Sequence, residues 1–600
     1  MYLPRQIGGQ LETHYTAQVD RPQADSVTLK NHLFFDRIRT DTAKSQYIRS
    51  ELKRIREGNG QMKTTLIHLI AAIAALLSSN AWADKCPFEL LNYFANPIAE
   101  GADPWMTKVG DFYYFCQSAG DGGIIVWKSN CITDKGTMRL VWKAPQAGWN
   151  RAQIWAPELH YLDGRWYIYY AASDGRNETH RMGVLRARTD DPQGDYKDLG
   201  MLYTGDEIET HSNNRWAIDG TPLQHRGKLY FVWSGWEDDR DIQWNYIAEM
   251  SNPWTIVTNR VRLAPNDTHL WERVDESAQG RGLHEAPQIL KSKDKIFVIY
   301  SCSGSWQTSY KQNWLWMCKD DDPMNPASWH KSPHPVFVGE ERVLGVGHPS
   351  FVTSPDGTED WILYHTKIGT QPGWQRVVMV QPFSRTDDGT PAFGKPFQPG
   401  QLLPYPSGRK ITWSTAAFAD SFEDNLLDRW VYYGHSSYAS VRDRQLHLGG
   451  RAPFSRLNDF RSGEKALVRG HAWQDFVLKT QLLIRSGTRD AGVVFRVHAP
   501  AVGYDAMRGY FAGIIPQTAK VVLGKMDGYR WHEIALADAP VQNNRPYELK
   551  VEARGDKISV FLDGQPVINR QDNQYPAGMA GVRVVDTHAV FDDFQVIPLR

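Results

Sequence analysis

The sequence has no excess of charge of either sign. Its 68 Lys and Arg residues equal its 68 Asp and Glu residues in number, and no long basic or acidic block occurs. Binding to nucleic acid or to an anionic membrane surface depends on clustered positive charge, so neither partner is indicated. The balance of charge favours a neutral partner.

Cysteine is scarce. The chain has five cysteines in 600 residues, and no two of them have the CxxC spacing of a zinc or redox site. Cys302 ends one expected strand and Cys318 ends the next apolar run, so a disulfide across neighbouring antiparallel strands is one hypothesis. Cys116 and Cys131 stand in a similar relation, and Cys86 would remain unpaired.

The apolar segment within residues 62–83 is short for a membrane span, which needs about 20 residues. It follows a lysine and ends in Ala-Trp-Ala, the small-x-small pattern of a signal peptidase site. We therefore expect residues 62–83 to be a signal peptide and residues 1–61 to be an upstream extension outside the mature protein. The protein is then secreted or periplasmic, with no membrane contact beyond the signal peptide. The alternative is an uncleaved signal anchor.

What the sequence does contain is a globular composition rich in aromatic residues. Hydrophobic residues make up 41% of the chain, which is long enough for two or more domains. Many of the 23 tryptophans belong to β-strands, but several fall in expected loops. These loop tryptophans are Trp105, Trp155, Trp236, Trp306 and Trp374. Because a sugar ring presents apolar C–H faces to an aromatic plane, they favour a carbohydrate ligand.

A repeated unit organises the first part of the chain. In each copy a polar residue is followed by a tight-turn pair and then by an aromatic β-run, as a hairpin requires. The five polar residues are Asp103, Glu158, Asp219, Glu285 and His348. Their spacing leaves room for four short strands per copy, which is typical of a β-propeller blade. We predict an all-β chain with a five-bladed propeller over residues 84–393, in which these side chains converge on one axial pocket. The alternative is that they only cap turns.

The remainder of the chain reads as a second all-β domain. Residues 394–416 are rich in Pro and Gly and form the expected linker. Residues 417–600 contain longer alternating strands and predict a β-sandwich of jelly-roll type. Its first and last segments, ADSFEDNLLDRW and FDDFQVIP, resemble those of concanavalin-like lectin and laminin-G-like modules. Such a module either binds sugar or only supports the propeller.

Short motifs in all five units resemble glycoside hydrolase family 43, whose members are five-bladed propellers. The motifs are ADPW, WAPE, AIDGTP, HEAP and GHPS, within residues 95–385. The resemblance implies that Asp103 is the general base, that Glu285 is the general acid, and that Asp219 holds the acid and keeps its pKa high. Family members invert configuration, so the carboxyl groups of Asp103 and Glu285 are expected to be about 6.5 to 9.5 Å apart.

Four further residues are expected at the site. Trp105 would wall the sugar subsite, and Glu158 would contact the substrate. Arg376 would pair with a substrate hydroxyl or with the acid, unless it only extends along a strand end. The resemblance places His348 on the channel axis, either as a ligand of a structural calcium ion or as a hydrogen-bonded structural residue. The chemistry itself requires no cofactor.

The expected function is removal of terminal α-L-arabinofuranosyl residues from plant cell-wall polysaccharides or oligosaccharides. Exo action is suggested by long inter-blade insertions at 238–246 and 305–313, which could close one end of the pocket. The same carboxylates would serve a β-xylosidase, a β-galactofuranosidase or an endo-arabinanase. The signatures of retaining fructan-cleaving propellers are missing. A non-catalytic carbohydrate-binding propeller is the alternative of another class, and the oligomeric state stays open.

Overall fold

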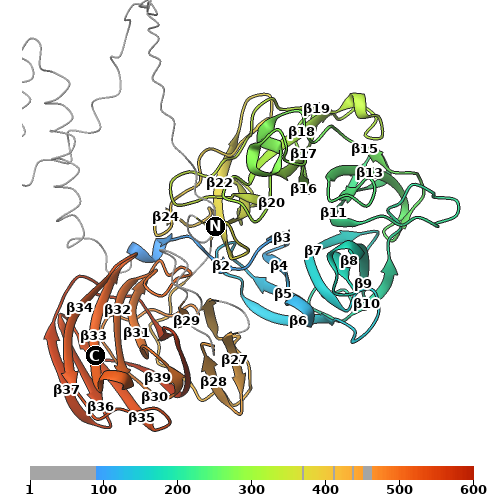
Figure 1. Cartoon of the computed structure of the whole chain (residues 1–600). Coiled ribbons are helices and arrows are strands. Elements are labelled where there is room, and N and C mark those ends of the chain that lie inside the picture. The colour runs from blue at the N-terminus through green and yellow to red at the C-terminus, as the bar shows by residue number, and fades with distance from the viewer. Residues whose placement is uncertain (1–88, 368–370, 410–411, 435–437, 451–462, 600) are drawn as a thin grey trace, which may run out of the picture. The chain divides into compact units, whose positions relative to one another are not determined.

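A computed structural model of the chain describes residues 89–367, 371–409, 412–434, 438–450 and 463–599. These residues form β-sheets joined by loops and short 3-10 helices (Figure 1). The expected upstream extension, the signal peptide and Cys86 lie outside the described residues. None of the helices in the described ranges has the length and hydrophobicity needed to cross a bilayer.

The propeller has five antiparallel sheets, one for each predicted blade (Figure 1). Blade 1 contains β3 (Trp105–Val109), β4 (Phe112–Ser118), β5 (Gly123–Ser129) and β6 (Thr137–Lys143), and blade 2 contains β7 (Ala152–Leu162), β8 (Arg165–Ser173), β9 (Arg181–Ala187) and β10 (Tyr196–Met201). Blade 3 contains β11 (Ala217–His225), β12 (Lys228–Trp236), β13 (Gln243–Asn252), β14 (Thr255–Ile256) and β15 (Val261–Arg262). Blade 4 contains β16 (His284–Lys291), β17 (Lys295–Cys302), β18 (Lys311–Cys318) and β19 (His330–Lys331).

Blade 5 closes the ring with a strand from the beginning of the propeller. Its sheet contains β20 (Gly347–Thr353), β21 (Asp360–Lys367) and β22 (Arg376–Arg385), and the outermost place is taken by β2 (Ala99–Glu100), while β23 (Pro391–Ala392) also pairs with β22. Outside the blades, β1 (Tyr93–Phe94) pairs with β24 (Leu403–Pro404). A hydrophobic cluster fills the space between each blade and the next, including that between blades 5 and 1. Burial of these apolar faces holds the ring together.

The inner strand of each blade is irregular where it approaches the axis. One residue per blade there has a backbone φ of +41° to +54°, and a Pro or Gly follows it. These residues are Asp103, Ala156, Asp219, Ala286 and His348. Pairing between the inner strand and its neighbour shifts register at this point in blades 2 to 5. Such bulges re-aim the adjacent side chains, and here they do so next to the axis.

The second domain is a β-sandwich, as predicted. One sheet has the order β27 (Ala439–Arg442), β28 (Gln445–Leu448), β39 (Thr587–Pro598), β30 (Phe476–Gly487), β35 (Pro546–Arg554), β36 (Lys557–Leu562) and β37 (Gln565–Gln571), and β25 (Phe418–Asp420) also pairs with β39. The other has the order β26 (Trp430–Tyr433), β29 (Glu464–Val468), β38 (Met579–Val584), β31 (Ala491–His498), β32 (Arg508–Ile515), β33 (Lys520–Asp527) and β34 (Trp531–Asp538). Alternate residues of both sheets form one hydrophobic core.

The predicted disulfides are wrong. All four described cysteines are free thiols. Cys302 ends β17 and pairs in register with Lys311, whereas Cys318 ends β18 and pairs with Lys295 at the opposite end of the same hairpin. Two strands that run antiparallel cannot bring their last residues together, so the two sulfur atoms lie at opposite ends of the strand pair.

Candidate active site

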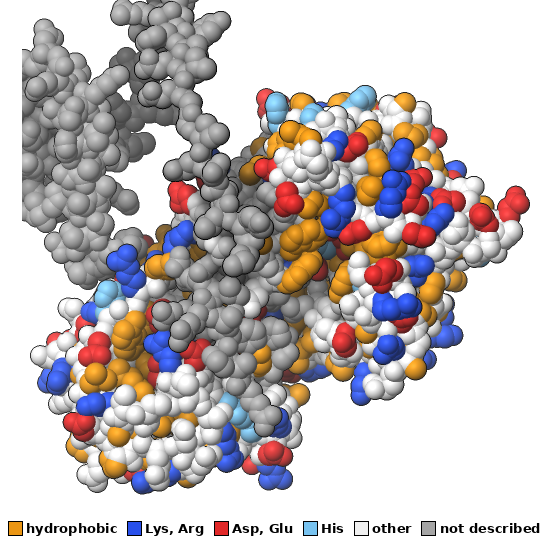
Figure 2. Space-filling view, in the orientation of Figure 1, with side chains coloured by type: hydrophobic (Ala, Val, Ile, Leu, Met, Phe, Trp, Pro, Cys, Tyr) orange, Lys and Arg blue, Asp and Glu red, His pale blue; other side chains and the backbone are white. Residues whose placement is uncertain are grey.

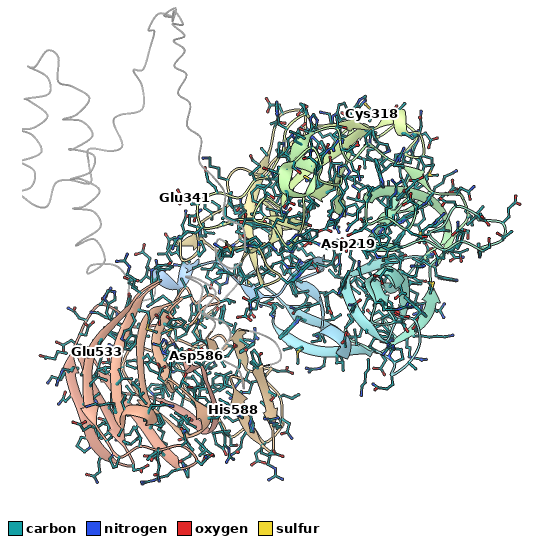
Figure 3. All side chains as sticks on the ribbon, viewed as in Figure 1. Asp219, Cys318, Glu341, Glu533, Asp586 and His588 are labelled. Atoms are coloured by element: carbon teal, nitrogen blue, oxygen red, sulfur yellow. The ribbon has the colours of Figure 1, made fainter. Side chains whose placement is uncertain are left out.

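The inner ends of the blades surround one cavity of about 730 Å³. Residues from all five blades line it, and they include Asp103, Asp219 and Glu285. Figure 3 shows Asp219 close to the centre of the ring of blades, and Figure 2 shows the hollowed face there. The three carboxylates that the sequence singled out therefore open onto the same space.

Asp103 is surrounded by basic groups. Its Oδ1 atom lies 3.2 Å from Nδ1 of His348 and 3.4 Å from Nη1 of Arg376, and its backbone N–H donates to Nδ1 of His365 at 3.2 Å. Burial opposes the charge on Asp103, but the positive charges of His348 and Arg376 outweigh it and hold the pKa of this carboxyl well below its usual range. Asp103 is therefore a carboxylate near neutral pH, as a general base must be.

Glu285 and Asp219 lie in a drier environment, with 6% and 4% of their surfaces exposed. Burial raises the pKa of Glu285. Burial also raises the pKa of Asp219, and the nearby carboxylates of Glu285 and Asp103 raise it further. Oδ2 of Asp219 accepts a hydrogen bond of 3.0 Å from the backbone N–H of Ala286, so Asp219 is tied to the residue that follows Glu285. Glu285 and Asp219 therefore keep a proton between them at a pH at which Asp103 is ionised. This difference in pKa suits Glu285 to act as the acid and Asp103 as the base.

A buried network fixes the strand that presents Glu285. Glu272 is fully buried and accepts hydrogen bonds from the backbone N–H of His269 and from Nζ of Lys331. Its Oε1 atom also lies 2.8 Å from Nε2 of His284, the residue before Glu285. Burial works against a charge on Glu272, but His284 and Lys331 outweigh it and lower the pKa of Glu272 to about 2. The first residue of β16 is thereby anchored on the side away from the cavity.

Three side chains near the axis could bring ligand atoms to one metal ion. The carboxylate of Asp103 and the imidazoles of His348 and His365 have ligand atoms within 4.8 Å of one another. Calcium prefers six to eight oxygen ligands, whereas this set offers one carboxylate and two imidazoles. Burial disfavours a charge on His348, but Asp103 outweighs it and raises the pKa of His348 to about 9. These three side chains alone do not provide the oxygen-rich shell that calcium prefers.

Two expected substrate contacts lie outside the cavity lining among the described residues. The indole N–H of Trp105 donates to the carbonyl of Leu159 at 2.9 Å, and its ring packs on His160. Glu158 is 1% exposed and pairs with His160 and with Gln288 of blade 4. The bulge in blade 2 places Ala156, not Glu158, at the position that Asp219 and His348 occupy in their blades. The polar residues of the five repeats are therefore not all equivalent.

Arg376 and His348 do line the cavity, together with residues that the sequence did not single out as site residues. Trp216 is one of these; its ring stacks on Trp236 at a centroid distance of 4.6 Å, so Trp236 supports the wall from behind. Others come from the two insertions and the adjoining loops, namely Asp241, Gln243, Arg281 and Ser305. The expectation that the insertions 238–246 and 305–313 close one end of the pocket was the only sequence signal for Asp241, Gln243 and Ser305, and it did not extend to Trp216 or Arg281.

Comparison with known proteins agrees with this geometry. Residues 94–391 match the model of glycosyl hydrolases family 43, and residues 417–596 match that of a 3-keto-alpha-glucoside-1,2-lyase-like domain. Alpha-L-arabinofuranosidase 43 of Humicola insolens is 33% identical over 345 residues, which cover 55% of this chain and 68% of that protein. Extracellular exo-alpha-(1->5)-L-arabinofuranosidase of Streptomyces chartreusis is 32% identical over 284 residues, which cover 46% of this chain and 82% of that protein. The protein described here is therefore a glycoside hydrolase that belongs to family 43.

Proposed function

We propose that the protein is an inverting, exo-acting α-L-arabinofuranosidase that releases terminal arabinofuranosyl residues from plant cell-wall polysaccharides or oligosaccharides. The observation that carries the proposal is the single cavity in which Asp103 has a lowered pKa and Glu285 a raised pKa. The similar proteins from Humicola insolens and Streptomyces chartreusis are α-L-arabinofuranosidases by name, which supports the choice of sugar.

The proposed reaction uses the two carboxyl groups on opposite faces of the sugar. Glu285 donates its proton to the glycosidic oxygen as the bond to the anomeric carbon breaks. Asp103 accepts a proton from a water molecule whose oxygen attacks that carbon. The product sugar has the opposite anomeric configuration, Glu285 is left ionised, and Asp103 is left protonated. Exchange of protons with water restores both groups.

The neighbouring residues prepare this step. His348 and Arg376 keep Asp103 ionised, and Arg376 is also placed to contact a substrate hydroxyl. Asp219 favours the protonated form of Glu285, because a second negative charge in a buried site is costly. Asp241 and Ser305, from the two insertions, line the cavity, which supports a closed pocket that receives a chain end.

We also propose that the chemistry needs no cofactor, since the carboxyl groups themselves supply the acid and the base. Activity is then expected to be unchanged after dialysis against EDTA. Loss of activity that only calcium restores would contradict this. Export of the protein is proposed from residues 62–83 together with the extracellular relatives. N-terminal sequencing of the mature protein tests it, and a mature chain that retains residues 1–61 would refute it.

Two measurements test the function. The first compares hydrolysis of nitrophenyl α-L-arabinofuranoside, β-D-xyloside and β-D-galactofuranoside, and we expect the arabinofuranoside to react fastest. Preference for another glycoside would assign the cavity to that sugar, and binding without hydrolysis would make the propeller a lectin. The second follows the first-formed anomer by NMR during cleavage of an arabino-oligosaccharide. We expect the inverted anomer and release of single arabinose units, whereas internal cleavage would indicate an endo-arabinanase.

A further inference from the structure

Two tryptophans from different blades stand together at the cavity. Trp306 follows β17 in blade 4, and Trp374 precedes β22 in blade 5. Their ring centroids are 5.7 Å apart, and both rings line the cavity that contains the carboxylates. Trp374 is 65% exposed, although it is one of the largest apolar side chains. An exposed pair of indoles inside a substrate cavity offers a large apolar surface to a ligand.

One buried lysine holds both tryptophan loops. Lys367 is 2% exposed, and its ammonium group donates to the carbonyl of Ser305 and, at 2.6 Å, to the carbonyl of Gly373. These carbonyls belong to the residues directly before Trp306 and Trp374. The backbone N–H of Gly373 also donates to the carbonyl of Trp306 at 2.7 Å. The two indoles are thus tied to each other through a shared lysine and a backbone hydrogen bond.

The lysine is costly to bury, and this cost is consistent with a specific role. Burial lowers the pKa of Lys367 to about 7, and the positive charge of Arg376 acts in the same direction. Each indole also has an arginine near its ring, Arg281 at 5.4 Å from Trp306 and Arg376 at 5.7 Å from Trp374. Asp241 pairs with Arg281 at 2.6 Å. An arginine therefore stands beside each ring, and the arginine beside Trp306 is itself held by an acidic side chain.

The location of the pair identifies which part of a substrate it would meet. Ser301 of β17 pairs in register with Glu285, and the loop that follows β17 carries Trp306. Trp306 therefore belongs to the side of the cavity where the general acid stands, and Trp374, two residues before the Arg376 that contacts Asp103, reaches across to it. In the proposed reaction the acid protonates the departing oxygen, so the group beyond that oxygen lies on this side.

We propose that Trp306 and Trp374 form an aromatic platform that binds the first sugar ring of the leaving group, and that Lys367 is the residue that positions this platform. The ligand is a neutral sugar ring that presents its C–H face to the indoles. This inference rests on the proposed hydrolysis at Glu285 and names the substrate portion that the same site selects. A leaving group too small to reach the platform would gain nothing from it.

The test compares two substrates of the same sugar, an α-1,5-linked arabinotriose and methyl α-L-arabinofuranoside. The measured quantity is the ratio of kcat/KM for the first substrate to kcat/KM for the second. We expect Trp374→Ala and Trp306→Ala each to lower this ratio about tenfold, because loss of one stacked sugar face removes about 60 Å² of buried apolar surface. The matched control is Trp254→Ala, at an exposed tryptophan outside the cavity lining, which should leave the ratio unchanged.

Lys367 is tested by its dependence on the tryptophans. We expect Lys367→Met to raise KM for arabinotriose more than it changes kcat for the methyl glycoside. In the background of Trp306→Ala with Trp374→Ala, the same substitution should lower the ratio no further. A lysine with only a structural role would instead reduce kcat/KM for both substrates. Its effect on the ratio would then be the same with and without the two tryptophans.

Unchanged ratios in both single tryptophan variants would overturn the platform. A wild-type enzyme that cleaves only xylosides would refute the choice of arabinofuranose but not the platform. The ratio would then be measured with xylotriose and methyl β-D-xyloside, and the same tenfold fall would be expected. Failure of the proposed function and failure of the platform are therefore distinguishable.

Discussion

Removing the general acid should affect substrates according to how much their leaving groups need a proton. In Glu285→Gln the side chain keeps its size but can no longer donate an acidic proton to the glycosidic oxygen. General acid catalysis contributes about 10²- to 10⁴-fold, which corresponds to about 2.7 to 5.4 kcal/mol in the activation free energy. The dry environment of Glu285, 6% exposed, places the effect toward the upper end for an arabino-oligosaccharide. For a dinitrophenyl arabinofuranoside, whose phenolate leaves without protonation, the loss should be less than about tenfold.

The assay measures kcat/KM for both substrates across the pH range. Wild-type activity on the oligosaccharide should fall at alkaline pH as Glu285 loses its proton, and the raised pKa of this group moves that fall upward from the ordinary range of a carboxyl. The alkaline fall should be absent in Glu285→Gln with the activated substrate. Glu209→Gln, at an exposed position, is the control for loss of a carboxylate. Equal losses for the two leaving groups would refute the assignment of Glu285 as the acid.

Three further predictions follow from the site and the thiols. In His348→Asn the pKa of Asp103 should rise, because the cation beside it is removed. The acidic limb of the pH profile of kcat/KM should therefore move to higher pH, and an unmoved limb would show that His348 does not control the pKa of the base. In Asp219→Asn the pKa of Glu285 should fall, because a like charge is removed, so the alkaline limb should move to lower pH and kcat should fall about tenfold. Because the four described cysteines are free, dithiothreitol should leave the melting temperature unchanged, and a clear decrease would reveal a disulfide.

The repeated pattern was sufficient to predict the propeller because each blade is a local unit. A turn pair such as Asp163-Gly164, with φ of +47° and +75°, suits a tight hairpin, and the aromatic run after it fills the space between blades. Asp103, Asp219 and Glu285 were found in the same way, since each stands where an inner strand begins. Their repeated position in sequence became a shared position in space.

Glu158 shows the limit of that argument. Its repeat contains the same type of motif, but a bulge at Ala156 shifts the register of the inner strand. The buried carboxylate of Glu158 accepts a hydrogen bond from Gln288 of blade 4 and does not face the cavity. Side chains on a strand alternate with a period of two, so an extra residue changes which side chain faces the cavity. Sequence spacing alone does not reveal where such a bulge falls.

The sequence by itself determined the class of fold, the number of blades and which three carboxyl groups meet at the cavity. It could do so because hairpins and their turns depend on residues close together in the chain. Only the tertiary structure decided which side chains line the cavity and how Lys367 joins the loops of Trp306 and Trp374. It also decided the direction of each pKa shift, since burial and the distance to charges from other blades set that direction. These quantities depend on residues far apart in sequence, which only the closed ring brings together.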